Sequence, residues 1–266
     1  TDLATLVMRM KENNPDRVIY LADARQSMHF IQVFRCARKT GIVPDTTELV
    51  HIGFGTMNGK DGKPFKTRDG GVMRLEYLLK EIDDEMLNKI KENQKEKENL
   101  NIDEAEAEQT AKTVALAAVK YGDLSNQASK DYIFDIDRFT SFEGNTGPYI
   151  LYTIVRIKSI LSKYEAKGGD ISALKDAIMP AVNAGQKNLM LSLAKFNATI
   201  ESAYEESAPH KICAYIYELA NAFNGFYHDT KILSEENEEL KKSYISLLVL
   251  TKEILEACID MLGFSA

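Results

Sequence analysis

The sequence predicts an α/β part followed by an all-α bundle. Strand-like and helix-like segments alternate over residues 1–52, which is the pattern of a parallel sheet with helical crossovers. From residue 75 onward apolar residues recur almost entirely at helical spacing, which indicates a bundle. With 266 residues the chain is also long enough for two domains.

The α/β part is predicted to run helix, strand, helix, strand. Apolar residues at helical spacing over 3–10 predict a helix, and the polar stretch 13–16 with its proline ends it. Residues 17–23 form an apolar run rich in β-branched side chains, which is typical of a buried parallel strand. A second helix is predicted around 30–37, and a second strand at 49–52.

Polar side chains follow both predicted strands. Asp23, Arg25 and Gln26 come directly after the first strand, His29 follows them, and His51 lies at the second. Because ligands bind beyond the carboxyl ends of parallel strands, we expect these side chains to converge on one site. The alternative is structural, since polar residues also cap helices and most such histidines satisfy hydrogen bonds of the fold.

Residues 51–71 form the segment richest in glycine and positive charge. Its glycines are Gly53, Gly55, Gly59, Gly62, Gly70 and Gly71, and its cations are Lys60, Lys63, Lys66 and Arg68. A pliable loop that carries lysines suits the binding of a polyphosphate during reaction. The alternative is a solvated surface hairpin, because Asn-Gly and Asp-Gly are ordinary turn signals. A P-loop is excluded, since the glycine spacing is one residue short and Asp61 stands where a hydroxyl is required.

The rest of the chain is predicted to be helical. Helical spacing covers residues 75–82, 104–121, 149–157, 189–200, 213–227 and 247–259. The charged run 89–99 is predicted to be a solvated helix end or loop, and 131–137 a strand or an extended connector. Glycine and proline at 142–148 indicate a boundary. We therefore expect domains at 1–80, 81–142 and 143–266.

Composition narrows the class of protein. A net charge of −7 argues against indiscriminate nucleic-acid binding but allows a local basic surface that docks one structured RNA. The three cysteines fit neither a disulfide framework nor a zinc site, so we expect buried thiols in a reducing cytoplasm. No apolar run is long enough for a membrane span. The chain begins without methionine, from which we expect a fragment or a processed protein.

Several motifs resemble those of one enzyme family. They are YLADARQSMH at 20–29, HIGFGTM at 51–57, GKDGKPFKTR at 59–68, AVKYGDL at 118–124, DYIF at 131–134, FEGNTGPY at 142–149 and CAYIYELA at 213–220. In this order they closely resemble arginyl-tRNA synthetase of the bacterial type, over essentially the whole chain. The resemblance implies a partial Rossmann-type parallel sheet, from the later half of a class I catalytic domain, followed by a helical anticodon-binding bundle.

The implied reaction joins arginine to ATP, which enters with Mg²⁺, and then esterifies tRNA(Arg). The resemblance implies a cytoplasmic monomer without a protein-bound metal. Asp2 and Gln26 match the positions that bind arginine, and a carboxylate suits a guanidinium because the two form paired charge-assisted hydrogen bonds. The positions that match the adenosine-binding wall are His29, His51, Phe54, Gly55 and Met57, and those of the phosphate loop are Lys63, Lys66 and Arg68.

Two departures from the family pattern matter. The signature Lys-Met-Ser-Lys-Ser has its lysine positions at Pro64 and Thr67 here, so no single catalytic lysine is assigned. The His-Ile-Gly-His signature is absent, since HIGF at 51–54 lacks the second histidine. We therefore expect the isolated chain to form no adenylate but to bind tRNA.

The expected tRNA-facing residues lie after the break at Gly147-Pro148. They are Tyr149, Tyr152 and Arg156, with the last two helices. The alternative is that these tyrosines pack inside the bundle, because helical spacing is also what a core requires. Two other functions stay open for the chain, namely a non-catalytic tRNA-binding module and an interaction scaffold derived from a synthetase.

Overall fold

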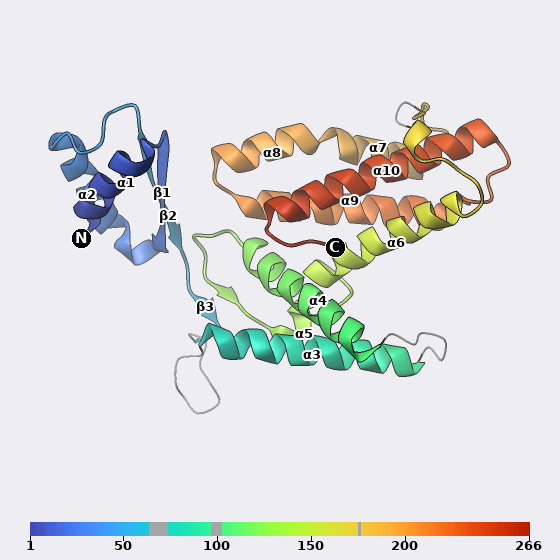
Figure 1. The fold of residues 1–266 in the computed structure, drawn as a ribbon, viewed down its shortest axis with the longest axis horizontal. Coiled ribbons are helices and arrows are strands. Elements are labelled where there is room, and N and C mark those ends of the chain that lie inside the picture. The colour runs from blue at the N-terminus through green and yellow to red at the C-terminus, as the bar shows by residue number, and fades with distance from the viewer. Residues whose placement is uncertain (64–73, 97–102, 175–176) are drawn as a thin grey trace. The chain divides into compact units, whose positions relative to one another are not determined.

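The computed structural model describes residues 1–63, 74–96, 103–174 and 177–266 (Figure 1). The chain forms two compact units. The first unit comprises Thr1–Phe65 and Asn126–Phe134, and the second comprises Lys66–Ser125 and Asp135–Ala266. The predicted order, a small parallel α/β part followed by a helical bundle, is confirmed.

The described residues of the first unit form two helices and two short parallel sheets of two strands each. Its elements are α1 (Asp2–Asn13), β1 (Arg17–Asp23), the 3₁₀ turn η1 (Ala24–Gln26), α2 (Ser27–Lys39), β2 (Glu48–Phe54), β3 (Met57–Asn58) and β4 (Tyr132–Ile133). β1 and β2 pair in parallel from Arg17↔Glu48 to Asp23↔Phe54. The carboxyl ends of both strands therefore lie level with each other, as the sequence predicts.

Both helices of this unit pack on one face of the β1–β2 sheet. The core consists of Leu6 from α1, Val18 from β1, Ala37 from α2 and Val43. Side chains alternate along a strand, and β1 accordingly turns Val18 into this core while Leu21 on the other face is 67% exposed.

The end of β1 is held by a short-range ion pair. Asp23 caps η1, because its Oδ1 accepts hydrogen bonds from the backbone amide of Arg25 at 2.8 Å and from its Nε at 2.9 Å. The capping interpretation is therefore correct for Asp23, and Arg25 is the donor that pairs with it. Hydrogen bonds from the Arg25 side chain and then from its amide lower the pKa of the Asp23 carboxyl to about 2.

A segment from later in the chain completes the first unit. β4 pairs in parallel with β3, and the Gly55 amide donates to the carbonyl of Ala128 at 2.8 Å. The Thr56 amide donates to Oδ1 of Asp131 at 2.6 Å. A Cβ on Gly55 would overlap the backbone of Lys130, so this close approach of two chain segments requires glycine.

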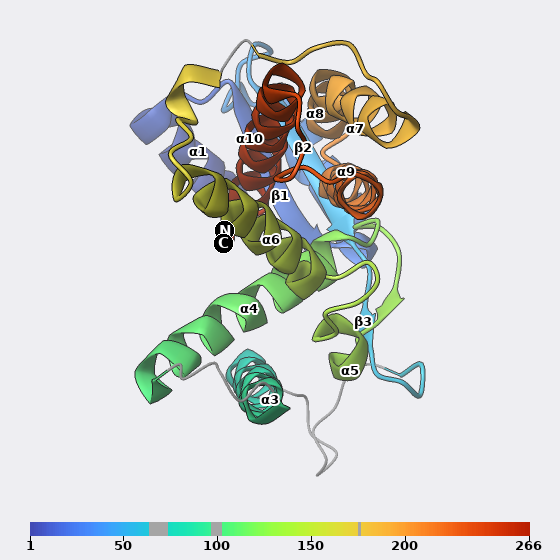
Figure 2. The ribbon, with the colours of Figure 1, turned by 90° about the vertical axis from the view of Figure 1, so that its right-hand side faces the viewer.

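The second unit is helical (Figure 2). Its elements are α3 (Leu75–Glu96), α4 (Glu104–Leu124), α5 (Ile136–Phe139), α6 (Gly147–Glu165), the 3₁₀ turn η2 (Ser172–Leu174), α7 (Ala184–Ala194), α8 (Phe196–Glu205), α9 (Pro209–Asp229) and α10 (Glu238–Met261). α3 packs on α4, and α6, α7, α8 and α10 pack around α9. The continuous helical spacing over 189–200 is divided between α7 and α8, which meet at Lys195 and both pack on α9.

Buried contacts tie α4, α6 and α9 together. The fully buried hydroxyl of Tyr121 lies 2.5 Å from Oδ1 of Asn145 and 2.8 Å from the carbonyl oxygen of Cys213. Burial raises the pKa of Tyr121, which stays a neutral hydrogen-bonding group. A Cβ on Gly147 would overlap the backbone of Ala117, so α4 and α6 meet at a glycine.

Side chains cap the first turns of α6 and α10. Thr146 Oγ1 accepts the Tyr149 amide at 3.2 Å and begins α6 at the predicted boundary. Asn237 caps α10 through the amides of Glu239 and Leu240. None of the described helices is both long and apolar enough to cross a lipid bilayer.

The cysteine prediction is correct only in part. Cys213 and Cys258 are buried, and burial raises the pKa of each thiol to about 12. Cys36 is exposed, because it lies on the outer side of α2 while its neighbour Ala37 enters the core.

We expect Tyr121→Phe to destabilise the second unit by about 1–3 kcal/mol, because it leaves the buried carbonyl of Cys213 without its hydroxyl partner. Urea unfolding followed by circular dichroism measures the change. Tyr77→Phe, at a tyrosine that is 59% exposed, is the matched control and should leave the midpoint unchanged. Equal midpoints for both variants would contradict the assignment.

We expect the Asp23 carboxyl to titrate with a midpoint of about 2 in the folded chain, measured by carbon-detected NMR. Its depressed pKa means that its contribution to stability is present above the ordinary pKa of 3.8 and is lost as the pH falls toward 2. Arg25→Gln should move the midpoint up toward 3.8, while the control Arg35→Gln should not. An unmoved midpoint in the Arg25 variant would show that another group lowers this pKa.

Candidate functional site

α1 and α2 bring a carboxylate and an imidazole together beside the sheet. Asp2 is the first residue of α1, and its Oδ2 lies 3.1 Å from Nε2 of His29 on α2. The side chain of Asp2 is 38% exposed and that of His29 is 53% exposed. A ligand can therefore reach both side chains and take the place of either one in the pair. Gln26, immediately before α2, is exposed and makes no capping hydrogen bond.

His51 lies in an aromatic cluster on the core side of the sheet. Its ring stacks on Phe30 of α2 with 4.7 Å between centroids and an interplanar angle of 21°. Tyr20 is the register partner of His51, and its ring lies 4.9 Å from Phe30. Neither Nε2 of His51 nor the Tyr20 hydroxyl has a hydrogen-bond partner among the described residues, and both atoms are buried. Burial raises the pKa of Tyr20. Tyr20 and His51, which are register partners in the sheet, therefore each carry a buried polar atom without a hydrogen-bond partner among the described residues.

The residues after the carboxyl end of β2 have different surroundings. Phe54 ends the strand and is 42% exposed, and Met57 begins β3. Gly55 lies between them, and the backbone of Lys130 already accounts for its lack of a side chain. The structure therefore gives Gly55 a packing role, whatever ligand approaches this edge.

The glycine-rich segment 51–71 contains a tight turn at residues 59–63. The Gly59 amide donates to the carbonyl of Lys63 at 2.8 Å, and Gly62, with φ 71°, donates to Gly59 at 2.9 Å. Lys63 is exposed next to this turn. Lys66 and Arg68, the other two residues of the predicted phosphate loop, lie outside the described residues.

In the second unit the three predicted tRNA-facing residues lie together. The Tyr149 hydroxyl donates to Oδ1 of Asn221 at 2.7 Å and accepts from Nδ2 of Asn224 at 2.8 Å. Arg156 donates to Oδ1 of the same Asn224 at 2.6 Å. The predicted residues on α6 are therefore joined to each other through two amides on α9.

Two aromatic rings also lie close to Arg156. Its guanidinium carbon lies 4.7 Å from the ring centroid of Tyr152 and 5.5 Å from that of Tyr227. The two tyrosines are 47% and 42% exposed, so the alternative of burial inside the bundle is wrong for Tyr152. We call these six residues the α6–α9 surface. They are Tyr149, Tyr152, Arg156, Asn221, Asn224 and Tyr227.

Sequence reasoning missed five of the residues in these two clusters. They are Tyr20, Phe30, Asn221, Asn224 and Tyr227. The three on α9 recur every third residue, which places them on one side of a helix, but the same spacing is found in any helix that packs. Tyr20 carried a signal too, because a hydroxyl inside an apolar strand needs a partner.

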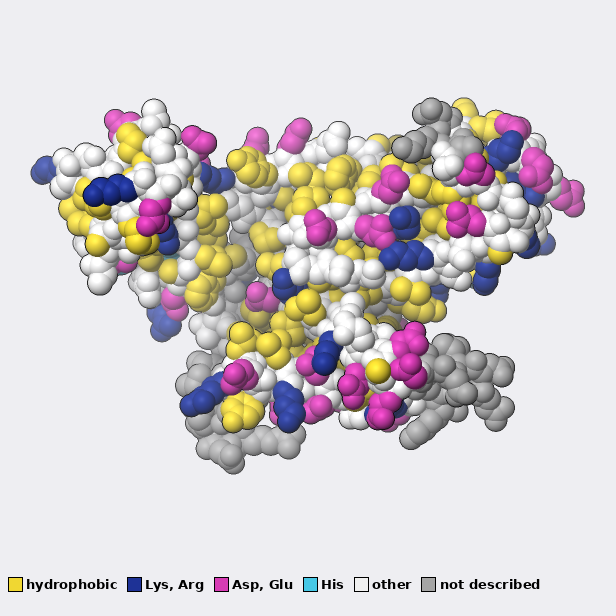
Figure 3. All heavy atoms as spheres, in the orientation of Figure 1, with side chains coloured by type: hydrophobic (Ala, Val, Ile, Leu, Met, Phe, Trp, Pro, Cys, Tyr) yellow, Lys and Arg dark blue, Asp and Glu magenta, His cyan; other side chains and the backbone are white. Residues whose placement is uncertain are grey.

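Charge is distributed locally in the helical unit. On the face seen in Figure 3, the described acidic and basic side chains are interspersed over the helices, without a wide basic patch.

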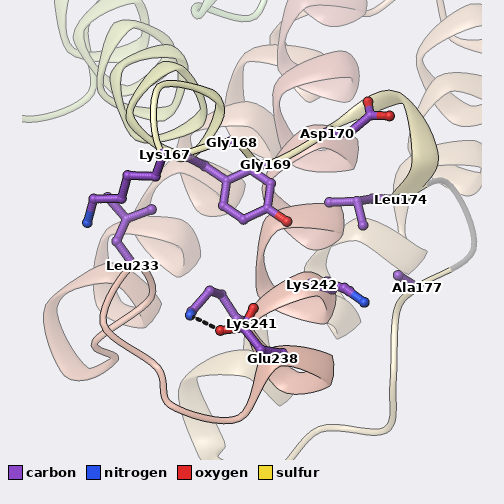
Figure 4. Close-up of a pocket in the computed structure, with 11 residues that line it drawn as sticks. Lys167, Gly168, Gly169, Asp170, Leu174, Ala177, Leu233, Glu238, Lys241 and Lys242 are labelled. Atoms are coloured by element: carbon purple, nitrogen blue, oxygen red, sulfur yellow. Dashed lines mark hydrogen bonds and ion pairs between the residues drawn. The ribbon is translucent and has the colours of Figure 1, made fainter.

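A cavity of about 540 Å³ lies between the end of α6 and the start of α10 (Figure 4). It is lined by lysines, but Lys241 is paired with Glu238 at 2.6 Å, and none of the predicted site residues borders it.

Comparison with known protein families matches both parts of the chain. Residues 1–136 match the family described as "tRNA synthetases class I (R), catalytic domain", and residues 150–266 match the "DALR anticodon binding domain". The chain is 54% identical over 266 residues to "Arginine--tRNA ligase" of Alkaliphilus oremlandii (strain OhILAs). It is 43% identical over 267 residues to the protein of the same name from Francisella tularensis subsp. tularensis (strain WY96-3418). All of this chain but only 44% of each relative is covered.

Solved structures agree with the fold. The arginyl-tRNA synthetase of Plasmodium falciparum superposes with a TM-score of 0.80 at 27% identity, covering 99% of this chain and 43% of that one. The Thermus thermophilus arginyl-tRNA synthetase, at 24% identity, shares the fold with a TM-score of 0.77, covering 94% and 40%. The resemblance seen in the motifs is confirmed, and the chain belongs to the class I (R) tRNA synthetase family.

Proposed function

We propose that this chain serves an arginine–tRNA ligase, in which arginine and ATP form arginyl-adenylate and pyrophosphate and the arginyl group then passes to tRNA(Arg). The observation that carries the proposal is the 54% identity to a protein of that name along the whole chain. Because the chain spans less than half the length of that relative, the complete reaction is assigned to a protein that includes these residues, not to this chain by itself.

The arginine site in this proposal centres on Asp2, with Gln26. A carboxylate accepts paired hydrogen bonds from a guanidinium, which is stronger than its present single contact with the half-exposed His29. Arginine would therefore displace His29 from Asp2. The freed imidazole would then be available to the neighbouring adenosine.

The ATP site in this proposal lies along the carboxyl edge of β1 and β2. Its residues are His29, His51, Phe54, Gly55 and Met57. Lys63, Lys66 and Arg68 would stabilise the negative charge that develops on the departing pyrophosphate. ATP enters as its Mg²⁺ complex, and the proposal includes no resident metal. The protein is further proposed to be cytoplasmic and monomeric.

The tRNA site in this proposal is the α6–α9 surface. Arg156 has no carboxylate within 4 Å among the described residues, and exposed tyrosine rings flank it. An unneutralised cation close to exposed aromatic rings suits a nucleic acid, because phosphates supply negative charge and unpaired bases stack on rings.

A non-catalytic tRNA-binding module is the second candidate. It is favoured by the α6–α9 surface, which is complete within one unit. The two candidates differ in whether these residues support adenylate formation.

We expect the 266-residue chain alone to show no arginine-dependent ATP–pyrophosphate exchange. When it replaces the matching segment of the Alkaliphilus relative, exchange should be retained, since the two are 54% identical throughout. Asp2→Asn in that chimera should raise the KM for arginine about tenfold or more, through loss of a charge-assisted pair. Asp45→Asn, on an exposed loop, is the matched control. Exchange by the chain alone, or an unchanged KM in the Asp2 variant, would contradict these assignments.

We expect Tyr152→Ala to weaken binding of tRNA(Arg) by the chain about tenfold, because stacking of a base on an aromatic ring contributes roughly 1–3 kcal/mol. Filter binding at fixed ionic strength measures it, with a non-cognate tRNA for comparison. Tyr204→Ala, at a tyrosine on α8 that is 72% exposed, is the control. Equal effects of the two substitutions, or equal retention of both tRNAs, would count against the α6–α9 surface as the specific site.

A further inference from the structure

α9 presents two amide side chains to α6, and together they form a directed chain of hydrogen bonds. Arg156 donates to Oδ1 of Asn224 at 2.6 Å, and Nδ2 of Asn224 donates to the Tyr149 hydroxyl at 2.8 Å. That hydroxyl donates in turn to Oδ1 of Asn221 at 2.7 Å. All three donors run in one direction, away from the cation. Each bond in such a chain polarises the next, which strengthens the whole.

Asn224 is the member of this series of hydrogen bonds that contacts Arg156 directly. Its oxygen accepts from Arg156 while its nitrogen donates to Tyr149. Rotating the amide by 180° would oppose a donor to a donor at the guanidinium, so only one orientation satisfies both neighbours. The guanidinium is thereby held at one of its nitrogens, and its carbon lies 4.7 Å from the ring centroid of Tyr152 and 5.5 Å from that of Tyr227.

Arg156 keeps most of its hydrogen-bonding capacity. A guanidinium has five N–H donors in one plane, and Asn224 takes one of them. Lys158, two residues further along α6, is by contrast neutralised by Glu256 at 3.0 Å. Arg156 is half-buried and has no such carboxylate among the described residues. A cation held in this way favours an anion that comes from outside the protein.

We propose that Asn224 is a positioning residue for tRNA binding. It holds the guanidinium of Arg156 close to the rings of Tyr152 and Tyr227, so that the remaining N–H donors meet a phosphate of the tRNA while the exposed rings meet unpaired bases. Asn224 itself does not touch the RNA. This inference rests on the proposed function and adds to it the way in which the arginine is oriented.

A purely structural role for Asn224 makes a different prediction. If the amide only holds α6 against α9, its loss should weaken tRNA binding whether or not Arg156 is present. If it acts through Arg156, its loss should have no further effect once the guanidinium is gone. A double-mutant cycle separates the two cases, because residues that act as a unit are not additive.

The experiment measures binding of tRNA(Arg) to the 266-residue chain by fluorescence anisotropy between about 50 and 200 mM salt. The variants are Asn224→Ala, Arg156→Ala, the two combined, and Asn224→Asp. Asn188→Ala is the matched control, because that amide is exposed on α7 and lies outside the α6–α9 surface. Thermal unfolding of each variant verifies that it is folded.

We expect Asn224→Ala to weaken binding about tenfold and to have no effect in the Arg156→Ala background. Asn224→Asp places a carboxylate against the guanidinium and neutralises it, so the slope of log K against log salt should fall by about one, as in Arg156→Ala. If Asn224→Ala does not fold, the Asp variant carries the test. The control should change binding much less than Asn224→Ala.

Additive effects in the cycle, or an unchanged salt slope in Asn224→Asp, would overturn the inference while the tRNA-binding proposal stands. An effect of Asn188→Ala as large as that of Asn224→Ala would also overturn it. Absence of tRNA binding by the unaltered chain would overturn the proposed tRNA site, and this inference with it.

Discussion

The parallel pairing of β1 with β2 is the interaction on which the proposed ligand edge depends. Its register carries both strands to one level, so the segments after Asp23 and Phe54 begin side by side. It also faces Tyr20 with His51 and lets Phe30 of α2 contact both rings. A slip of one residue would turn these side chains to the opposite face. The register therefore fixes the composition of the edge before any ligand is considered.

Much of this architecture could be predicted from the sequence, because it depends on local sequence patterns. The apolar run at 17–23, the helical spacing of the bundle and the boundary at 142–148 each depend on neighbours close in the sequence. Even the convergence of the two strand ends follows from a rule of parallel sheets. The features that do not depend on contacts between distant residues were therefore predictable.

The remainder could not be predicted, because it depends on contacts between distant residues. Gly55 reads in the sequence as one glycine of a flexible loop, whereas its neighbour in space is Lys130. Tyr149 and Asn221 are separated by 72 positions, and their contact depends on how α6 and α9 are rotated about their axes. Spacing alone leaves that rotation open, which is why the amides of the α6–α9 surface were missed while its arginine and two of its tyrosines were not.

The segment Asn126–Phe134 has a consequence for how the protein can be divided. It belongs by its contacts to the first unit, although the chain on both sides of it belongs to the second, so the backbone passes between the units three times. No single cut of the gene yields both units whole. A cut after residue 80 would deprive Gly55 and Thr56 of the backbone and carboxylate that hold them. The helical bundle beyond residue 142 contains none of this segment and is the piece that can be separated without loss to the sheet.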